Sequence, residues 1–365
     1  MTTGNLFNEF REYPAIIKII GVGGAGGNAV NRMIESHIKG VEFIAANTDA
    51  QALRSSLAGL KLQLGMERTK GLGVGGDPEV GRNAAVDDKE KIKEVLVGAD
   101  MVFITAGMGG GTGTGAAPVV AEIAKELGIL VVGVITKPFI FEGRLRNRHA
   151  EEGVKKLSES VDTMISIPNQ RLFTVIDENT SADKAWEKVD DVLRQGVQSI
   201  SDVITSTGII NVDFNDVKAI MKGAGEALMG MGEGEGEGRA TLAAEMAMSS
   251  PLLEDVSING ACGVLVNITG SRDLKMYEIN EAMSLIHDSV SPDANVYFGQ
   301  VFDDTLKDKI KITVIATSFD RGQKLQRIEL DHKKNIFKQS NMPFVDSTNN
   351  INEPAFLRKN KKKLW

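Results

Sequence analysis

Residues 109–115 carry the clearest chemical signal in the chain. Their sequence is Gly-Gly-Gly-Thr-Gly-Thr-Gly, so five of the seven are glycine. A glycine in regular structure costs roughly 0.5–1 kcal/mol relative to alanine, so a run of this density needs an offsetting use. Bare backbone N–H groups can surround phosphate oxygens, and a helix that follows them adds its positive N-terminus. The run therefore predicts a phosphate-binding loop, against the alternative of an ordinary glycine-rich turn.

A second glycine motif lies at residues 21–26, Gly-Val-Gly-Gly-Ala-Gly. It matches the dinucleotide fingerprint G-x-G-x-x-G, which follows a strand and opens a helix. Such a site needs an acidic residue about 20 residues further on, and Glu42 or Asp49 could serve. The motif alone leaves a dinucleotide-dependent oxidoreductase open. The loop at 109–115 favours another nucleotide, because a dinucleotide enzyme has no obvious use for it, and the sequence contains no P-loop signature with its lysine.

Apolar runs alternate with amphipathic stretches through the first half of the chain. Strands are predicted at residues 16–20, 43–46, 101–106, 129–136 and 163–167. Helices are predicted at residues 28–36, 78–97, 114–127 and 144–160. This alternation predicts an α/β fold with a parallel sheet covered on both faces. Ligands of such sheets bind outside the carboxyl ends of the strands, which is where both glycine motifs fall.

A long helical pattern over residues 181–206 precedes a second unit. That unit has predicted strands at 264–269, 295–301 and 311–318 and predicted helices at 239–248 and 276–290. Residues 232–238 alternate glycine with glutamate and are interpreted as a flexible acidic connector. We therefore divide the chain into an N-terminal arm (1–14), a nucleotide-binding domain (15–180), a central helix (181–207), a smaller α/β C-terminal domain (208–320), a linker (321–350) and a tail (351–365).

Composition excludes several classes of protein. The 42 basic and 49 acidic residues give a net charge of −7, and only 5% of residues are aromatic, so we expect no nucleic-acid partner. The single cysteine, Cys262, rules out an internal disulfide, fits a reducing compartment and is expected to be buried. No apolar run reaches the roughly 18 residues of a membrane span, and the first residues lack the apolar core of a signal peptide. We expect a cytoplasmic protein.

Further short motifs accompany the two glycine loops. The set comprises residues 21–30, 47–50, 71–76, 109–115, 136–139, 167–169 and 211–216. In this order they resemble FtsZ, a bacterial family of cell-division GTPases related to tubulin. The resemblance covers residues 16–319 and again 353–358. It implies a tubulin/FtsZ-like fold, with a Rossmann-like parallel-sheet GTPase domain, a long central helix and a smaller α/β C-terminal domain.

The resemblance also implies GTP as the ligand, with Mg²⁺ held through the phosphates and no metal ligand from side chains. The residues implied to bind GTP are Gly23, Gly24, Asn28, Gly110, Gly111, Thr112, Gly113, Thr136, Glu142, Arg146, Trp186 and Asp191. Asp191 would recognise guanine, because a carboxylate can accept from both N1–H and the 2-amino group. Two positions depart from the family pattern: Trp186 replaces a phenylalanine beneath the base, and Asp190 replaces a common asparagine.

Asn211, Asp213 and Asp216 follow the end of the long helical pattern. From spacing alone, Asp213 is better interpreted as the N-cap of a helix that starts near Phe214. The resemblance favours catalysis instead: these residues would enter the nucleotide pocket of the next subunit and polarise water against the γ-phosphate. Hydrolysis at a head-to-tail junction implies filaments, since such contacts do not close.

The last fifteen residues are basic, and Pro354, Phe356, Leu357 and Arg358 resemble the terminal peptide of the family. That peptide implies membrane-tethering and regulatory division proteins as partners, with Phe356 and Leu357 as anchors. The alternative is a disordered basic end. Residues 361–363, all lysine, add at most weak direct contact with anionic lipid.

The leading hypothesis is a self-assembling cytoskeletal GTPase of bacterial cell division, concentrated at midcell at the septum. One alternative is a paralogue that binds nucleotide without hydrolysing it, which the changes at Trp186 and Asp190 leave open. The other is the dinucleotide oxidoreductase, which the second glycine loop argues against.

Overall fold

A computed structural model describes residues 15–174, 179–205, 212–250, 258 and 260–319. The chain divides into a compact unit of residues 1–320 and a second unit of residues 321–365, and the described residues all belong to the first. The predicted arm, linker and tail lie outside the described residues, as do Asn211 and the tail residues Pro354, Phe356, Leu357 and Arg358.

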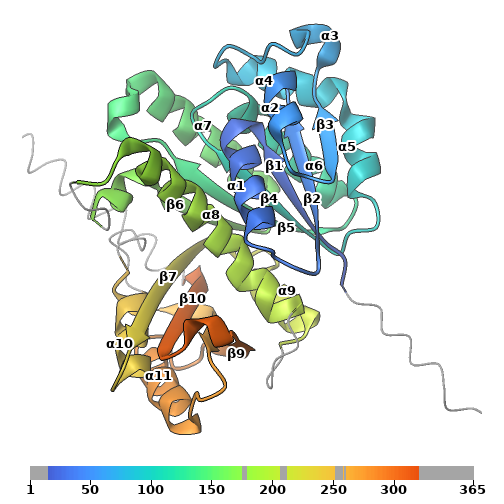
Figure 1. Cartoon of the computed structure of the whole chain (residues 1–365). Coiled ribbons are helices and arrows are strands. Elements are labelled where there is room, and N and C mark those ends of the chain that lie inside the picture. Colours follow the sequence, from blue (N-terminus) through green and yellow to red (C-terminus); the bar gives the residue numbers. More distant parts are fainter. Residues whose placement is uncertain (1–14, 175–178, 206–211, 251–257, 259, 320–365) are drawn as a thin grey trace, which may run out of the picture. The chain divides into compact units, whose positions relative to one another are not determined.

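One sheet organises the described residues (Figure 1), with strand order β3-β2-β1-β4-β5-β6-β7-β10-β8-β9. The strands are β1 (Ile17–Val22), β2 (Val41–Asn47), β3 (Leu60–Gln63), β4 (Met101–Gly107), β5 (Leu130–Lys137), β6 (Thr163–Pro168), β7 (Gly225–Glu235), β8 (Ala261–Gly270), β9 (Asn295–Phe302) and β10 (Lys309–Phe319). From β3 to β7 all neighbours are parallel. The pairs β7–β10 and β10–β8 are antiparallel, and β8–β9 is parallel.

Helices connect and cover these strands. They are α1 (Gly23–Glu35), α2 (Ala50–Ser55), α3 (Met66–Thr69), α4 (Pro78–Asp87), α5 (Lys89–Leu96), α6 (Thr112–Glu126), α7 (Arg144–Ser160), α8 (Ala182–Thr205), α9 (Phe214–Met221), α10 (Arg239–Met248) and α11 (Met276–Asp288), with short 3-10 turns η1 (Ile140–Glu142), η2 (Asn169–Thr174) and η3 (Asp304–Leu306). None of the helices in the described part is long and apolar enough to cross a bilayer.

The predicted strands and the predicted helices are confirmed, with one division. The amphipathic stretch at 78–97 is two helices, α4 and α5, because Asp88 leaves the helical conformation between them. Asp88 instead accepts a hydrogen bond from the Gly65 backbone N–H at 2.7 Å. The short elements β3, α2 and α3 were not predicted from the sequence.

The parallel strands of the N-terminal lobe (residues 15–174) separate two apolar clusters. Ile20, Ile44 and Ile104 lie on one face, in a cluster that includes α6. Ile19 and Phe103 lie on the opposite face, in a cluster that includes α1 and α8. Alternate residues of each strand thus enter different cores, as the two-residue period of a strand requires. The prediction of a sheet covered on both faces is confirmed.

Helix α8 packs beside α1 and contributes an apolar stripe to the second of these clusters. Its buried residues Leu193, Val197 and Ile200 follow helical spacing. The same cluster includes Leu265 and Ile315 of the C-terminal lobe, which we define as residues 225–319. The two lobes therefore share one core around α8.

The prediction of a flexible connector at 232–238 is wrong, because residues 232–235 belong to strand β7. Gly232 and Gly234 are buried under α10: a Cβ there would lie 2.0 Å from the Ala243 and Arg239 carbonyl oxygens, respectively. Glu233 on the other face is exposed and pairs with Lys309 of β10 at 2.6 Å. The glycine–glutamate alternation thus marks a strand with one face pressed against a helix.

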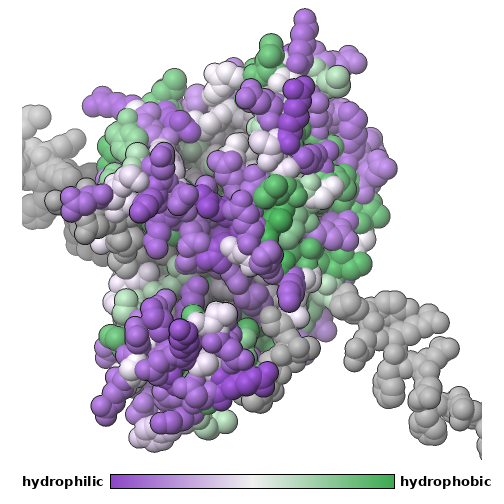
Figure 2. Space-filling view, viewed as in Figure 1, coloured by the Kyte–Doolittle hydropathy of each residue, from purple (hydrophilic) through white to green (hydrophobic). Residues whose placement is uncertain are grey.

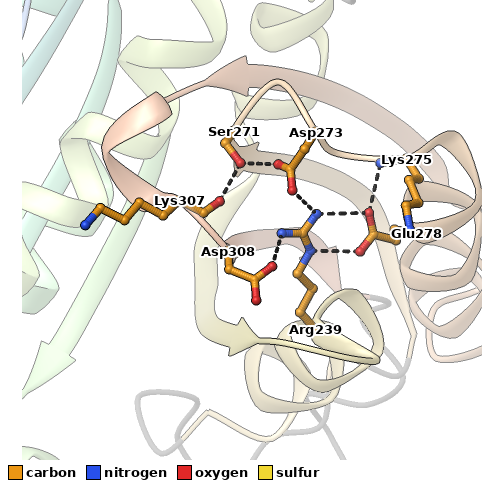
Figure 3. Close-up of polar contacts among 7 residues, drawn as sticks. All are labelled: Arg239, Ser271, Asp273, Lys275, Glu278, Lys307 and Asp308. Carbon is orange, nitrogen blue, oxygen red and sulfur yellow. Dashed lines mark hydrogen bonds and ion pairs between the residues drawn. The ribbon is translucent and has the colours of Figure 1, made fainter.

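Arg239 is 4% exposed at the start of α10 and is surrounded by carboxylates (Figure 3). Its guanidinium contacts Glu278 at 2.8 Å, Asp308 at 2.9 Å and Asp273 at 3.2 Å. Glu278 also accepts from the Lys275 backbone N–H at 2.8 Å, which caps α11. One cation therefore joins α10, α11 and the loop before β10.

Cys262 is exposed on β8, so the expectation that it is buried is wrong. Its neighbours on the strand, Ala261 and Gly263, are both buried.

Candidate nucleotide-binding site

A cavity of about 580 Å³ lies beyond the carboxyl ends of β1 and β4. Strand order reverses between these two strands, since β2 and β3 lie on one side and β5 and β6 on the other. Such a switch point is the usual ligand site of an open parallel sheet. Ten of the twelve residues implied to bind GTP line this cavity, namely Gly24, Asn28, Gly110, Gly111, Thr112, Gly113, Thr136, Glu142, Arg146 and Trp186.

Two of the helices that begin at the cavity, α1 and α6, have no side-chain cap. Neither Val22 before α1 nor Gly111 before α6 provides a side-chain acceptor, and neither first turn contains an acidic residue. By contrast, α2 and α4 are capped by Asp49 and Asp77. The free backbone N–H groups of α1 and α6 therefore remain available to an anion, and the helix dipoles favour one.

Glycine is required where the two loops meet. Gly23 has φ +77°, and a Cβ there would lie 2.8 Å from the Gly113 nitrogen. Gly109 has φ +100°, and a Cβ would lie 2.7 Å from the Arg146 carbonyl oxygen. At Gly24 and Gly110 a Cβ would meet no atom within 4 Å, so the space beside these two residues is open. Close contact of bare backbone beside open space is the arrangement expected of a phosphate cradle.

Hydroxyl groups hold the loop in shape. The Oγ1 atoms of Thr48 and Thr112 lie 2.7 Å apart, which ties the end of β2 to the start of α6. The Gly109 N–H donates to Thr114 Oγ1 at 2.8 Å. Thr114 therefore supports the loop from behind and does not line the cavity.

Glu142 and Arg146 form one side of the cavity. Glu142 accepts from the Phe139 backbone N–H at 2.8 Å and from Arg146 Nε at 3.0 Å. Arg146 is about half exposed, with a side-chain exposure of 53%, so its guanidinium can still reach an added phosphate. Thr136 lies at the end of β5 beside them and is buried.

An aromatic group bounds the other end. Trp186 is 44% exposed and meets Phe139 edge-on, with ring centroids 5.3 Å apart. Asn169 is buried at 4% exposure, lines the cavity, and its Oδ1 has no hydrogen-bond partner. A partly exposed indole and a buried acceptor without a partner suit a planar base with N–H donors.

Asp191, which the resemblance assigns to guanine recognition, is not among the residues that line the cavity. Its carboxylate accepts from Arg194 and Gln195, each at 2.6 Å. Asp190 lines the cavity instead. Successive residues of a helix point about 100° apart, so a shift of one position changes which carboxylate enters a site. Gly23 also lies outside the lining, directly behind Gly113.

Asp213 and Asp216 do not line the cavity. Asp213 is exposed and caps α9, accepting from the Asp216 backbone N–H at 2.9 Å. The N-cap predicted from spacing is therefore present. It occupies one carboxylate oxygen and leaves the other free, so the cap and a role on a neighbouring molecule are compatible.

Other lining residues were missed. They are Asn47, Gly73, Gly75, Gly76 and Asn169, among others. These five belong to motifs 47–50, 71–76 and 167–169, which the sequence analysis recognised without giving these residues a role. Asp49 is already engaged as the cap of α2, and Glu42 pairs with Lys18 at 3.4 Å, away from the cavity. Glu42 therefore cannot hold the ribose of a dinucleotide in this cavity, whereas the cap of α2 uses only Oδ1 of Asp49, which lines the cavity.

Within the described ranges, no group of three or more His, Cys, Asp or Glu could hold a metal ion.

Two family models match the chain. The GTPase domain of the Tubulin/FtsZ family matches residues 16–177, and the C-terminal domain of the FtsZ family matches residues 225–320. Together with the switch-point cavity, these matches define a tubulin-like protein built on a GTPase domain.

Solved structures give the same result. An FtsZ dimer from M. jannaschii, described as empty, is 42% identical with a TM-score of 0.81, and the match covers 84% of this chain and 89% of that one. A point mutant of FtsZ from M. jannaschii is also 42% identical, with a TM-score of 0.80 over 83% and 91%. CetZ2 from Haloferax volcanii, in a GTPγS-bound protofilament, shares the fold at 21% identity and a TM-score of 0.69 over 89% and 99%. The chain belongs to the FtsZ family.

Proposed function

We propose that the chain binds GTP in the switch-point cavity and hydrolyses it at the junction between two copies. One observation carries this proposal: the cavity at the switch point offers the uncapped N-termini of α1 and α6 for phosphate. Of the carboxylates that line it, Asp49 caps α2 through Oδ1, Glu142 is held by the Phe139 N–H and by Arg146, and Asp190 lies at the base end. We propose that the carboxylate that positions water comes from a second copy of the chain.

Asp213 and Asp216 are the residues proposed to supply it. They lie together at the start of α9, and neither faces the cavity of its own chain. Delivered by the next subunit, their carboxylates would orient and polarise water, while the backbone N–H groups of α1 and α6 stabilise charge on the phosphates. Mg²⁺ would offset further phosphate charge. Asn211 would act beside them.

Head-to-tail assembly follows from a site divided between two molecules, because such contacts do not close and generate filaments. The similar FtsZ structure is described as a dimer, and the CetZ2 structure as a protofilament. We propose that this chain forms filaments as well, and that it acts in the cytoplasm at the division septum. Its tail residues Pro354, Phe356, Leu357 and Arg358 would bind membrane-tethering and regulatory proteins.

At the base end, we propose that Trp186 stacks on guanine and Asp190 accepts from its N1–H and 2-amino groups. Adenine offers no matching pair of donors there, so the chain should prefer GTP to ATP. Asn169 Oδ1 is positioned to accept another hydrogen bond from the ligand.

The concentration dependence of activity tests the divided site. We expect GTP turnover per molecule to rise steeply with protein concentration, because only molecules at a junction are complete. Sedimentation with GTP and with GDP, run in parallel, should give a pellet that depends on GTP. Constant turnover per molecule down to concentrations at which nothing sediments would show a self-contained monomeric enzyme.

Trp186 provides a direct binding signal. The chain has two tryptophans, Trp186 and Trp365, so a Trp365→Phe background leaves one emitter. We expect GDP to quench its fluorescence through stacking on the base, and ATP to do so only at far higher concentration. Trp186→Phe should abolish the signal while calorimetry still detects binding. Equal responses to GDP and ADP would contradict guanine recognition.

A further inference from the structure

Thr48 directly follows β2 and lies behind the nucleotide cavity. Its neighbours Asn47 and Asp49 both line the cavity, whereas Thr48 does not and is fully buried, with an exposure of 0%. Its side-chain hydroxyl contacts that of Thr112, with 2.7 Å between the two Oγ1 atoms. Thr112 is the first residue of α6 and lines the cavity. The two hydroxyl groups therefore lead from the interior of the lobe to the phosphate loop.

The burial of Thr48 determines which of the two hydroxyl groups donates. The distance alone allows either direction, because a contact of this length between two hydroxyl groups needs only one proton. Among the residues that the structure describes, Thr112 Oγ1 is the only hydrogen-bond partner of Thr48 Oγ1. A buried hydroxyl proton without an acceptor costs free energy, so Thr48 must donate to Thr112. The proton of Thr112 is then available to an acceptor in the cavity.

The position of Thr48 is fixed by the strand before it and by Thr69. Asn47, the last residue of β2, is paired with Gln63 of β3. Thr69 Oγ1 lies 3.3 Å from the carbonyl oxygen of Thr48. A β-branched side chain also has few accessible χ1 rotamers. The hydroxyl of Thr48 therefore contacts Thr112 from a rigid support.

We propose that Thr48 is a positioning residue for phosphate: by donating to Thr112, it orients the Thr112 hydroxyl so that this group donates to a phosphate oxygen of the nucleotide. This inference rests on the proposed function, since it concerns the same cavity. The hydrogen bond that Thr112 accepts polarises the one that it donates, so the two bonds strengthen each other. Thr48 itself does not touch the nucleotide.

The test compares GDP and guanosine affinities, measured by calorimetry at pH 7.5. Thr112→Val should weaken GDP binding about ten- to a hundredfold, because it removes a hydrogen bond to a charged group. Thr48→Val should weaken it only about three- to tenfold, since Thr112 can still donate. Thr48→Ala should give the same loss, and Thr48→Ser, which keeps the hydroxyl, should bind GDP like wild type. Guanosine has no phosphate, so its affinity should be the same in every variant.

Thermal unfolding without nucleotide tests the direction of the hydrogen bond. Thr112→Val leaves the buried Thr48 hydroxyl without an acceptor, whereas Thr48→Val leaves Thr112 beside the open cavity. We therefore expect Thr112→Val to lower the Tm more than Thr48→Val does. The double variant should regain stability, because replacing both partners of a buried hydrogen bond removes the unsatisfied group.

The matched control is Thr317→Val. Thr317 is also fully buried and contacts the carbonyl oxygens of Ile220 and Gly263, at 3.3 and 3.2 Å. It lies on β10 of the C-terminal lobe, whose surface is mainly hydrophilic in the view of Figure 2. Thr317→Val should lower the Tm and leave GDP affinity unchanged, because its hydroxyl is remote from the phosphate loop.

A purely structural contact predicts a different pattern, since either single substitution breaks the same bond. Equal losses of GDP affinity in Thr48→Val and Thr112→Val would overturn the inference. It would also be overturned if Thr48→Val bound GDP like wild type, or if its effect persisted unchanged in the Thr112→Val background. Absence of GDP binding in wild type would instead refute the proposed function, so the two failures are distinguishable.

Discussion

Replacing Asp216 by asparagine is expected to lower GTP turnover by about a hundredfold or more while leaving GTP affinity close to that of wild type. The magnitude is typical of losing a group that activates a nucleophile. Affinity survives because Asp216 does not line the cavity of its own chain. Steady-state phosphate release tests the loss of turnover, and calorimetry on the same preparation tests whether GTP affinity is unchanged.

Asp213→Asn is expected to have a similar kinetic effect without loss of stability. Asparagine is about as good an N-cap as aspartate, so α9 should keep its bond from the Asp216 N–H. Asp213→Ala would add a stability cost of about 1 kcal/mol for the lost cap. Asp303→Asn, which changes the cap of η3, is the matched control and should leave turnover unchanged. Wild-type turnover in both Asp213→Asn and Asp216→Asn would refute the divided site.

Arg239→Met is expected to destabilise the protein by about 3 kcal/mol. Removing one partner of a buried ion pair leaves an uncompensated charge, which commonly costs 3–5 kcal/mol. The lower end applies because, of the three carboxylates, only Glu278 is largely buried, with side-chain exposure of 18% against 58% and 66% for Asp273 and Asp308. Thermal and urea unfolding measure the change.

The control is Lys309→Met, which removes an exposed pair with Glu233 and should cost at most about 1 kcal/mol. The loss at Arg239 should also depend on pH. The hydrogen bond from Arg239 holds the pKa of Glu278 below its ordinary 4.5. A carboxyl group whose pKa is lower in the folded state stabilises that state at pH values above its ordinary pKa. This stabilisation is lost as the pH falls through the lowered pKa. The difference between Arg239→Met and wild type should therefore shrink in acid. Equal costs for Arg239→Met and Lys309→Met would contradict this account.

The glycine motifs could be placed from sequence because their chemistry is local. A dense run after a strand has few uses, and the structure puts Gly110 through Gly113 at a switch point between uncapped helices. The orientation of α8 about its axis was harder to predict from the sequence. Asp190 and Asp191 are adjacent and identical in type, so only the packing of α8 against α1 determines which one enters the cavity.

Strand β7 shows another limit. Glycine and glutamate have low strand propensity, and their alternation suggested a solvated connector. A tertiary contact outweighs this propensity: α10 lies so close to the strand that only glycine fits at Gly232 and Gly234. Asn169 and Asp49 were inside recognised motifs, but whether a polar side chain caps a helix or faces a ligand depends on contacts that spacing does not reveal.

The core around α8 has a consequence for how this chain can be taken apart. Ile19 of β1 and Ile315 of β10 belong to one apolar cluster, with Leu193 and Val197 of α8 between the lobes. A fragment ending before α8 would expose the face that α8 covers, and one starting after it would lose its half of that cluster. The lobes are thus not exchangeable modules. Recombination between distant relatives would have to preserve the apolar contacts of both lobes with α8 to yield a protein that folds.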